Sequence, residues 1–320
     1  MKYINYLSLV TVLLLTACSA DEQIKEDLSF VGTPIDIRIS LDGQEGQTRA
    51  VQTMPIGQSA YLTTDHVSIR EYYYNESSVL TSPSPLVWTS GNATTIYGYY
   101  IDGGLHIPAI DRSYLVTPTT NSYLAGKDIV QYKDNTGTYS STAQLTLKQQ
   151  LAKIIITIKA ADGTSTITNG QLGGGMIHTS GTFSDIFDAN GYGIGGDGYV
   201  EGSTDGTGWT VDTRRNPETL ELGNPVYDES SKTYSFTVTL MPQIISNTST
   251  PFFTVTVADI FSASYYLSSP VLFQAGKTYN MNVDDVTKTL YITNSIYVED
   301  FTGYDASRVA ITATTTATWN

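Results

Sequence analysis

The chain has 320 residues, of which 40% are hydrophobic and 11% aromatic, so it is long enough to bury more than one sizeable core. Its 17 Lys and Arg residues face 31 Asp and Glu residues, which gives a net charge of -14. No basic cluster that would follow phosphates is present, and this argues against nucleic acid as a partner. Thr, Ser, Val, Ile and Gly are abundant beside 23 Tyr residues, a composition that favours sheets and turns over helices.

The first 18 residues predict a lipoprotein signal peptide. Lys2 supplies the positive charge, and the apolar stretch from Tyr6 to Leu15 is too short for a permanent span, which needs about 20 residues. Leu15-Thr16-Ala17-Cys18 resembles a bacterial lipobox, so we expect lipid on Cys18 to hold the precursor in the outer membrane. The alternative is a leader cysteine with no role. Because Cys18 is the only cysteine, we expect a mature protein without disulfides.

An acidic segment follows Cys18 and contains Asp21, Glu22, Glu26 and Asp27. It resembles the surface-export signal that follows the lipidated cysteine in lipoproteins of Bacteroidota, which predicts a place on the cell surface. A solvated flexible tether explains the same composition equally well, and both interpretations stay open.

Residues 34–41 predict a strand with one buried face, because apolar and polar side chains alternate along it. The apolar residues are Ile35, Ile37, Ile39 and Leu41. Arg49-Ala50 follows after a polar segment rich in Gly and Gln, a context open to a protease. A cut at this bond would detach the strand, so residues 19–49 are predicted to form an acidic tether and a removable first strand.

Short strand patterns separated by turn residues continue to residue 159 and predict a β-sandwich. The most hydrophobic run after the leader, Leu151 to Lys159, is rich in Ile and predicts a central strand. Near residue 165 the composition changes to a Gly- and Asp-rich tract, residues 172–209, with little to bury. We interpret this tract as an interdomain region followed by long loops. Strand patterns resume at residue 232.

These patterns predict an all-β protein with two domains in tandem, residues 50–165 and 166–320. The second domain ends in a segment without Gly or Pro, residues 309–319, in which mostly apolar residues alternate with Thr. The apolar residues are Val309, Ile311, Ala313, Ala317 and Trp319. The segment is either the ordinary final strand of the domain or a strand made to be donated to another subunit.

Motifs for catalysis and metal binding are absent from the sequence. It has no GxSxG, HExxH, SxxK or CxxC, and His66, His106 and His178 are far apart, so we expect no enzyme and no cofactor. Residues 191–196 spell GxGxxG, but a Gly-rich stretch follows in place of the helix that a dinucleotide site needs. The acidic residues between Asp185 and Asp205 are candidates for binding a structural cation, and this alternative stays open. The segment does not match a calcium loop, because Tyr192 and Tyr199 occupy ligand positions.

Two tyrosine clusters are a further feature, Tyr72-Tyr73-Tyr74 and Tyr97/Tyr99/Tyr100. Their rings could stack on sugars. Consecutive strand residues point to opposite faces, however, so at least half of these tyrosines are more simply packing or edge-covering residues.

Four segments of the chain resemble the fimbrillin family, the type V pilins and related surface lipoproteins of Bacteroidales. They are the lipobox at Cys18, Thr48-Arg49-Ala50, the Leu145 to Ile156 segment, and Phe273 to Val283. Ala-Lys-Ile-Ile and Gly-Lys-Thr-Tyr within the last two are the most specific, and a His that often precedes the former in relatives is missing here.

The resemblance implies two transthyretin-like β-sandwich domains and a structural subunit of a cell-surface fimbria. In this family an Arg-specific protease removes the lipid and the first strand, and Arg49 is the matching position here. This removal leaves a hydrophobic groove, which the C-terminal strand of a neighbouring subunit then fills. Implied partners are other pilin subunits and fimbrial anchor or tip proteins. The alternatives are an anchor or tip adhesin that keeps its lipid, and a surface lipoprotein that binds a host protein or glycan.

Overall fold

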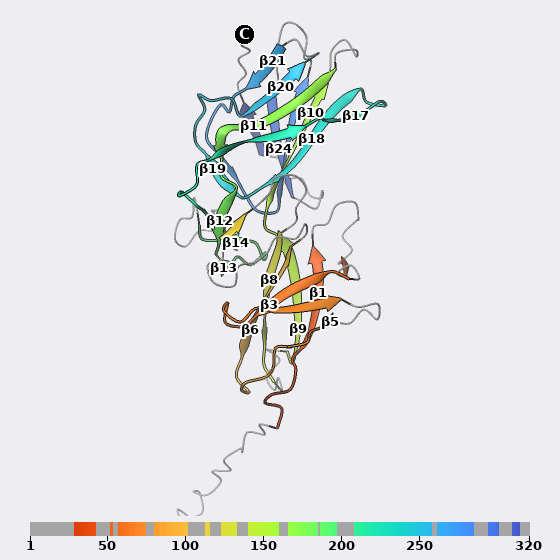
Figure 1. The fold of residues 1–320 in the computed structure, drawn as a ribbon, viewed down its shortest axis with the longest axis vertical. Coiled ribbons are helices and arrows are strands. Elements are labelled where there is room, and N and C mark those ends of the chain that lie inside the picture. The colour runs from red at the N-terminus through yellow and green to blue at the C-terminus, as the bar shows by residue number, and fades with distance from the viewer. Residues whose placement is uncertain are drawn as a thin grey trace, which may run out of the picture.

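The computed structural model describes residues 29–42, 52–53, 57–74, 80–101, 113–115, 123–132, 140–159, 166–184, 186–196, 208–257, 261–284, 294–300 and 309–313. All regular structure in these residues is β, in 25 strands, which confirms the all-β class predicted from the sequence (Figure 1). None of the described residues belongs to a helix long and apolar enough to cross a membrane.

The first half of the chain builds an eight-stranded sheet. In spatial order its strands are β2 (Gln52–Thr53), β1 (Asp36–Asp42), β9 (Thr142–Gln149), β8 (Tyr123–Val130), β6 (Thr94–Ile101), β3 (Ser59–Thr63), β4 (Arg70–Tyr74) and β5 (Leu80–Thr81). Alternate residues of these strands turn to one face and form a core with Phe30, Leu86 and Trp88. The sheet bends around this core, so that β3 crosses β9 in Figure 1.

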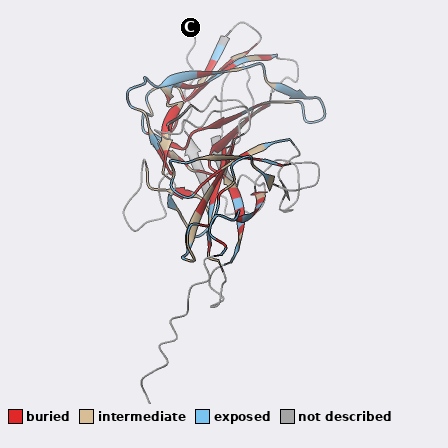
Figure 2. Ribbon diagram, turned by 60° about the horizontal axis from the view of Figure 1, so that its bottom comes forward, coloured by how far each residue is buried: buried red, intermediate tan, exposed pale blue. Residues whose placement is uncertain are grey.

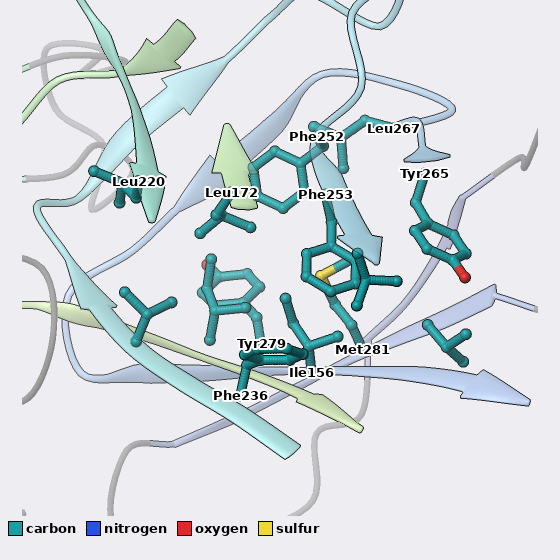
Figure 3. Close-up of a cluster of buried hydrophobic side chains, with 14 of the residues drawn as sticks. Ile156, Leu172, Leu220, Phe236, Phe252, Phe253, Tyr265, Leu267, Tyr279 and Met281 are labelled. Carbon is teal, nitrogen blue, oxygen red and sulfur yellow. The ribbon is translucent and has the colours of Figure 1, made fainter. Parts of the chain in front are cut away.

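Two further sheets face each other and form a β-sandwich. The six-stranded sheet contains, in spatial order, β17 (Val226–Asp228), β18 (Thr233–Leu240), β10 (Ala152–Lys159), β23 (Lys277–Asp284), β24 (Asn294–Asp300) and β25 (Val309–Ala313). The four-stranded sheet contains β16 (Glu218–Gly223), β11 (Ile167–Ile177), β20 (Phe253–Val257) and β21 (Phe261–Tyr265). Figure 3 shows Leu172 and Phe253 of one sheet opposite Ile156 and Phe236 of the other. Beside this core, β19 (Gln243–Ile245) pairs with β22 (Val271–Phe273).

The chain passes from the first sheet to the sandwich within two residues, because β9 ends at Gln149 and β10 begins at Ala152. The predicted central strand is β10, which pairs antiparallel with β18 and parallel with β23. The boundary predicted near residue 165 therefore does not coincide with the change of sheet. Hydrophobicity identifies a buried strand but does not show in which core it is buried. The division into two domains stays a prediction.

Where we had expected long loops, the described residues of the Gly- and Asp-rich tract form strands. They include the second half of β11, the strands β12 (Ser180–Phe183), β13 (Ile186–Phe187) and β14 (Gly193–Ile194), and the first residue of β15 (Trp209–Val211). Leu172, Phe183 and Trp209 are fully buried. The glycines let aromatic rings approach the backbone: a Cβ on Gly193 would lie 2.5 Å from the Phe183 ring. Burial follows the strands of both halves of the molecule in Figure 2.

A third core, which we call the junction cluster, lies where the first sheet meets β12 and β15. Its buried members are Tyr99, Tyr123, Ala125, Leu151, Phe183, Trp209 and Met241. The ring centroids of Tyr123, Phe183 and Trp209 lie 5.1–5.4 Å apart in tilted or edge-on pairs. Strand β7 (Ser113–Leu115) pairs with β12 and so adds a backbone link between the first half of the chain and the second.

The side chain of Gln150 ties the junction together. It is fully buried, and its Nε2 donates to the carbonyl oxygens of Ala125, Lys148 and Gly191 at 3.0–3.2 Å. Its Oε1 accepts from the Gly193 N–H at 2.8 Å. The Gln150 backbone carbonyl accepts the indole N–H of Trp209 at 2.9 Å. One residue therefore hydrogen-bonds to polar groups of β8, β9 and the β14 hairpin.

Two buried tyrosines of the sandwich provide a test of its polar packing. The Tyr279 hydroxyl donates to the Leu272 carbonyl at 2.9 Å and accepts from the Gln274 N–H at 2.8 Å. The Tyr265 hydroxyl has no hydrogen-bond partner among the described residues. Burial raises the pKa of both, so both stay protonated.

We expect Tyr279→Phe to lower the free energy of unfolding by about 1–3 kcal/mol, because it leaves two backbone groups unpaired. The matched variant Tyr265→Phe should leave that free energy unchanged or raise it, since it removes an unpaired hydroxyl. Urea denaturation of the full chain measures both changes. Equal losses in the two variants would contradict this assignment.

Candidate strand-exchange site

Strand β1 is the strand that the sequence predicts to be removable, and it lies between β9 and β2. It pairs in parallel with β9 along its whole length, from Asp36 opposite Thr142 to Asp42 opposite Lys148. On its other edge it pairs with β2 at two positions only, Ser40 with Thr53 and Leu41 with Gln52. Its loss would therefore expose the full edge of β9.

The apolar face of β1 is buried as the alternation predicts. Ile35, Ile37 and Ile39 are 6–7% exposed, and Leu41 is 1% exposed. They join the core of the eight-stranded sheet, where Ile39 is level with Leu145 and Leu41 with Leu147 of β9. On the solvent side, the Thr142 hydroxyl donates to Asp36 Oδ2 at 3.0 Å and the Ser40 hydroxyl donates to Thr146 Oγ1 at 3.1 Å.

The segment before β1 is a part of the site that the alternation did not reveal. Phe30 is buried and stacks on Tyr132 with ring centroids 3.6 Å apart, and it meets the edge of Trp88 at 6.3 Å. The sequence signal for this buried segment is the apolar pair Phe30-Val31 before Gly32. A turn separates the pair from β1 and interrupts the alternation of apolar and polar residues.

Backbone hydrogen bonds fix this entry segment against residues 86–88. The N–H groups of Gly32 and Ile35 donate to the carbonyls of Trp88 and Leu86 at 2.8 and 2.9 Å, and the Trp88 N–H donates to Thr33 at 3.0 Å. The Leu86 N–H in turn donates to the Tyr72 hydroxyl at 2.7 Å. Burial raises the pKa of Tyr72. Residues 86–88 are thus hydrogen-bonded both to the entry segment and to Tyr72 of β4.

The processing residues lie outside the described residues. This applies to Cys18 and to Arg49 and Ala50, which belong to the connection between the end of β1 at Asp42 and the start of β2 at Gln52. Along the chain, the predicted cut falls between β1 and β2, which are paired in one sheet. A cut after Arg49 would leave β2 on the chain and separate it from β1.

The predicted donor strand is divided between described and undescribed residues. Val309, Ile311 and Ala313 belong to β25, the last strand of the six-stranded sheet, where they are level with Val298, Ile296 and Asn294 of β24. Ala317 and Trp319 lie outside the described residues. Within one chain, β1 and β25 thus belong to different sheets, and donation of β25 to another subunit stays a prediction.

The remaining candidates from the sequence find mainly structural roles. Asp188 of the predicted cation loop uses its carboxylate to accept from the N–H groups of Asn190 and Tyr192 at 2.8 and 2.9 Å. The described residues contain no group of three or more side chains suited to a metal, while Asp185 and residues 197–207 lie outside them. In the tyrosine clusters, Tyr72, Tyr74, Tyr99 and Tyr100 are buried, and Tyr73 is exposed.

Comparison with solved structures identifies the fold. A protein of Bacteroides uniformis that is provisionally assigned to cell adhesion is 17% identical, with a TM-score of 0.54 over 84% of this chain and 99% of that chain. A protein of Bacteroides ovatus with the same provisional assignment is 15% identical, with a TM-score of 0.52 over 83% and 97%. The match to the fimbrial anchor protein Mfa2 from Porphyromonas gingivalis covers 88% of this chain and 100% of that chain at 11% identity, but its TM-score of 0.36 is too low to support an argument.

No protein-family model matches the chain, and no curated protein matches it. The solved structures share little sequence with it, so their likeness concerns the fold. The chain has the fold of these Bacteroides proteins assigned to cell adhesion, which agrees with the fimbrillin-like fold that its sequence motifs predict.

Proposed function

We propose that the protein is a structural subunit of a cell-surface fimbria that supports adhesion. It is exported as a lipoprotein through Cys18, cut by a protease after Arg49, and polymerised when a strand of a neighbouring subunit replaces β1. The observation that carries this proposal is the position of β1: one continuous apolar row in a core, joined to the next strand by the connection that contains Arg49.

The geometry favours replacement of β1 over simple loss. Removing the segment up to Arg49 would take five buried side chains, including Phe30, out of the first core and would leave an unpaired edge of β9. Such an edge beside an apolar groove is a template for strand addition. The predicted donor segment around β25 carries the alternating pattern that a replacement strand needs.

The N-terminus of the protein on cells tests the proposal. We expect mass spectrometry of assembled material to show a chain that begins at Ala50, and an Arg49→Ala variant to stay lipidated at Cys18 and outside fibres. Arg38→Ala is the matched control, because Arg38 lies within β1 and its loss should leave processing unchanged. An acylated Cys18 on assembled wild-type protein would contradict the proposal. That result would favour an anchor or tip adhesin that keeps β1.

A further inference from the structure

An aromatic surface lies on the face of the eight-stranded sheet opposite its core. Neighbouring residues of β3, β4 and β6 alternate between the faces, so Tyr72 and Tyr100 belong to the core while Tyr61, Tyr73 and Tyr97 are on the other face. The junction cluster covers part of that face, and Tyr61 and Tyr97 pack half-buried against it. Tyr73 stands beyond it and is 43% exposed.

The strand register places the three rings on one diagonal row. Tyr61 is level with Glu71 of β4 and with Tyr99 of β6. Tyr73 is level with Ser59, two residues before Tyr61 on β3, and Tyr97 is level with Thr63, two residues after it. Tyr73 and Tyr97 therefore lie diagonally on either side of Tyr61. Diagonal neighbours on one face of a sheet are within reach of aromatic side chains. We call Tyr61, Glu71, Tyr73 and Tyr97 the tyrosine platform.

A hydrogen bond from Tyr73 holds the carboxylate of the platform. The Tyr73 hydroxyl donates to Glu71 Oε2 at 2.6 Å. This bond raises the pKa of Tyr73, and burial followed by the Glu71 charge raises the pKa of Tyr61. Both phenols therefore hold their protons near neutral pH. With the Tyr73 proton directed at Glu71, these two residues offer a ligand only acceptor oxygens.

The loop beside Tyr97 is ordered by its own hydrogen bonds. The Asp65 carboxylate accepts from the N–H groups of Ser68 and Val67 at 2.7 and 2.9 Å and from the Thr63 hydroxyl at 3.0 Å. These bonds hold the pKa of Asp65 well below its usual range. The loop carries His66, whose ring centroid lies 4.0 Å from that of Tyr97. One end of the platform is thus held in place before any ligand arrives.

We propose that the tyrosine platform binds a neutral glycan. The exposed Tyr73 ring, with the accessible parts of the half-buried Tyr61 and Tyr97 rings, would stack on the apolar faces of sugar rings. Glu71 and the Tyr73 oxygen would accept hydrogen bonds from sugar hydroxyls. Rigid tyrosine rings supply contact area at low entropic cost. Acceptor oxygens and a net charge of -14 disfavour sialylated or sulfated glycans. Three rings beside one carboxylate that already accepts the Tyr73 hydrogen bond favour an uncharged ligand over a basic peptide.

The test is binding of the purified full chain to arrayed neutral oligosaccharides of hexose, N-acetylhexosamine and fucose, with sialylated and sulfated counterparts and a Lys/Arg peptide as separate arms. We expect binding to neutral members. Tyr73→Ala should weaken it by about tenfold or more, and Glu71→Gln should weaken it too. Tyr227→Ala is the matched control and should change nothing, because Tyr227 is equally exposed at 43% but lies on β17.

Several results would overturn the inference: no binding to any neutral oligosaccharide, binding that survives both Tyr73→Ala and Glu71→Gln, or binding restricted to the sialylated, sulfated or peptide arms. Thermal unfolding of each variant shows whether the fold is kept, and Tyr73→Phe separates loss of the hydroxyl from loss of the ring. The platform does not involve β1 or β25, so its outcome is independent of the proposed strand exchange.

Discussion

A chain that begins at Ala50 is expected to lose the stability of its eight-stranded sheet. The removed segment contributes five core side chains, Phe30, Ile35, Ile37, Ile39 and Leu41, whose burial is together worth on the order of 10 kcal/mol. A whole domain is stable by only about 5–15 kcal/mol. We therefore expect the shortened chain to unfold at lower urea concentration and to associate through the open edge of β9.

A synthetic peptide with the sequence of residues 29–42 should reverse this loss. Added to the shortened chain, it is expected to raise the urea midpoint with the logarithm of its concentration once the site is saturated, because a ligand that binds only the folded state stabilises it. The same peptide with Ile37→Asp and Ile39→Asp is the control and should have no effect, since both side chains enter the core. A shortened chain with the midpoint of the intact protein would show that β1 is dispensable.

Replacing Gln150 with leucine is the second change for which we expect a large effect, a loss of about 3–5 kcal/mol in the free energy of unfolding. Leucine has a similar volume but leaves the Gly193 N–H and the carbonyls of Ala125 and Gly191 buried without this partner. Each unsatisfied buried group costs about 1–3 kcal/mol, and the losses are not fully additive. Denaturation followed by tryptophan fluorescence measures the change, since Trp209 lies in the junction cluster.

Gln144→Leu provides the comparison for this variant. Gln144 lies on β9, the strand that ends just before Gln150, but it is exposed, and we expect its replacement to change stability by less than about 0.5 kcal/mol. Equal losses in the two variants would mean that the effect comes from the introduced leucine and not from the hydrogen bonds of Gln150.

The sequence was most informative where a strand has one solvent-exposed face and one buried face. Alternation alone located the buried row of β1, which consists of Ile35, Ile37, Ile39 and Leu41. The candidate site was foreseen to the same extent: its apolar row was predicted residue by residue, and the presence of a cut at Arg49 remains a prediction.

Features that depend on contacts distant in sequence could not be read from a local pattern. The Gly-rich tract looked loose because its glycines have no side chains, yet Gly193 lies against the Phe183 ring and Gly181 against the Met241 side chain. Gln150 is one of two adjacent glutamines at a strand end, and only the fold shows that its amide meets three other segments. Phe30 is separated from β1 by a turn, so its stacking on Tyr132 needed the tertiary structure.

The two-residue passage from β9 to β10 has a mechanical consequence. The two strands follow one another along the long axis of the molecule, and each is hydrogen-bonded to neighbours on both sides (Figure 1). A pull on the ends of the molecule would load both sheets in shear, with many hydrogen bonds sharing the force at once, in place of opening them one bond at a time. Gln150 and the junction cluster lie at the short link between them. This arrangement is suited to carrying tension along the long axis.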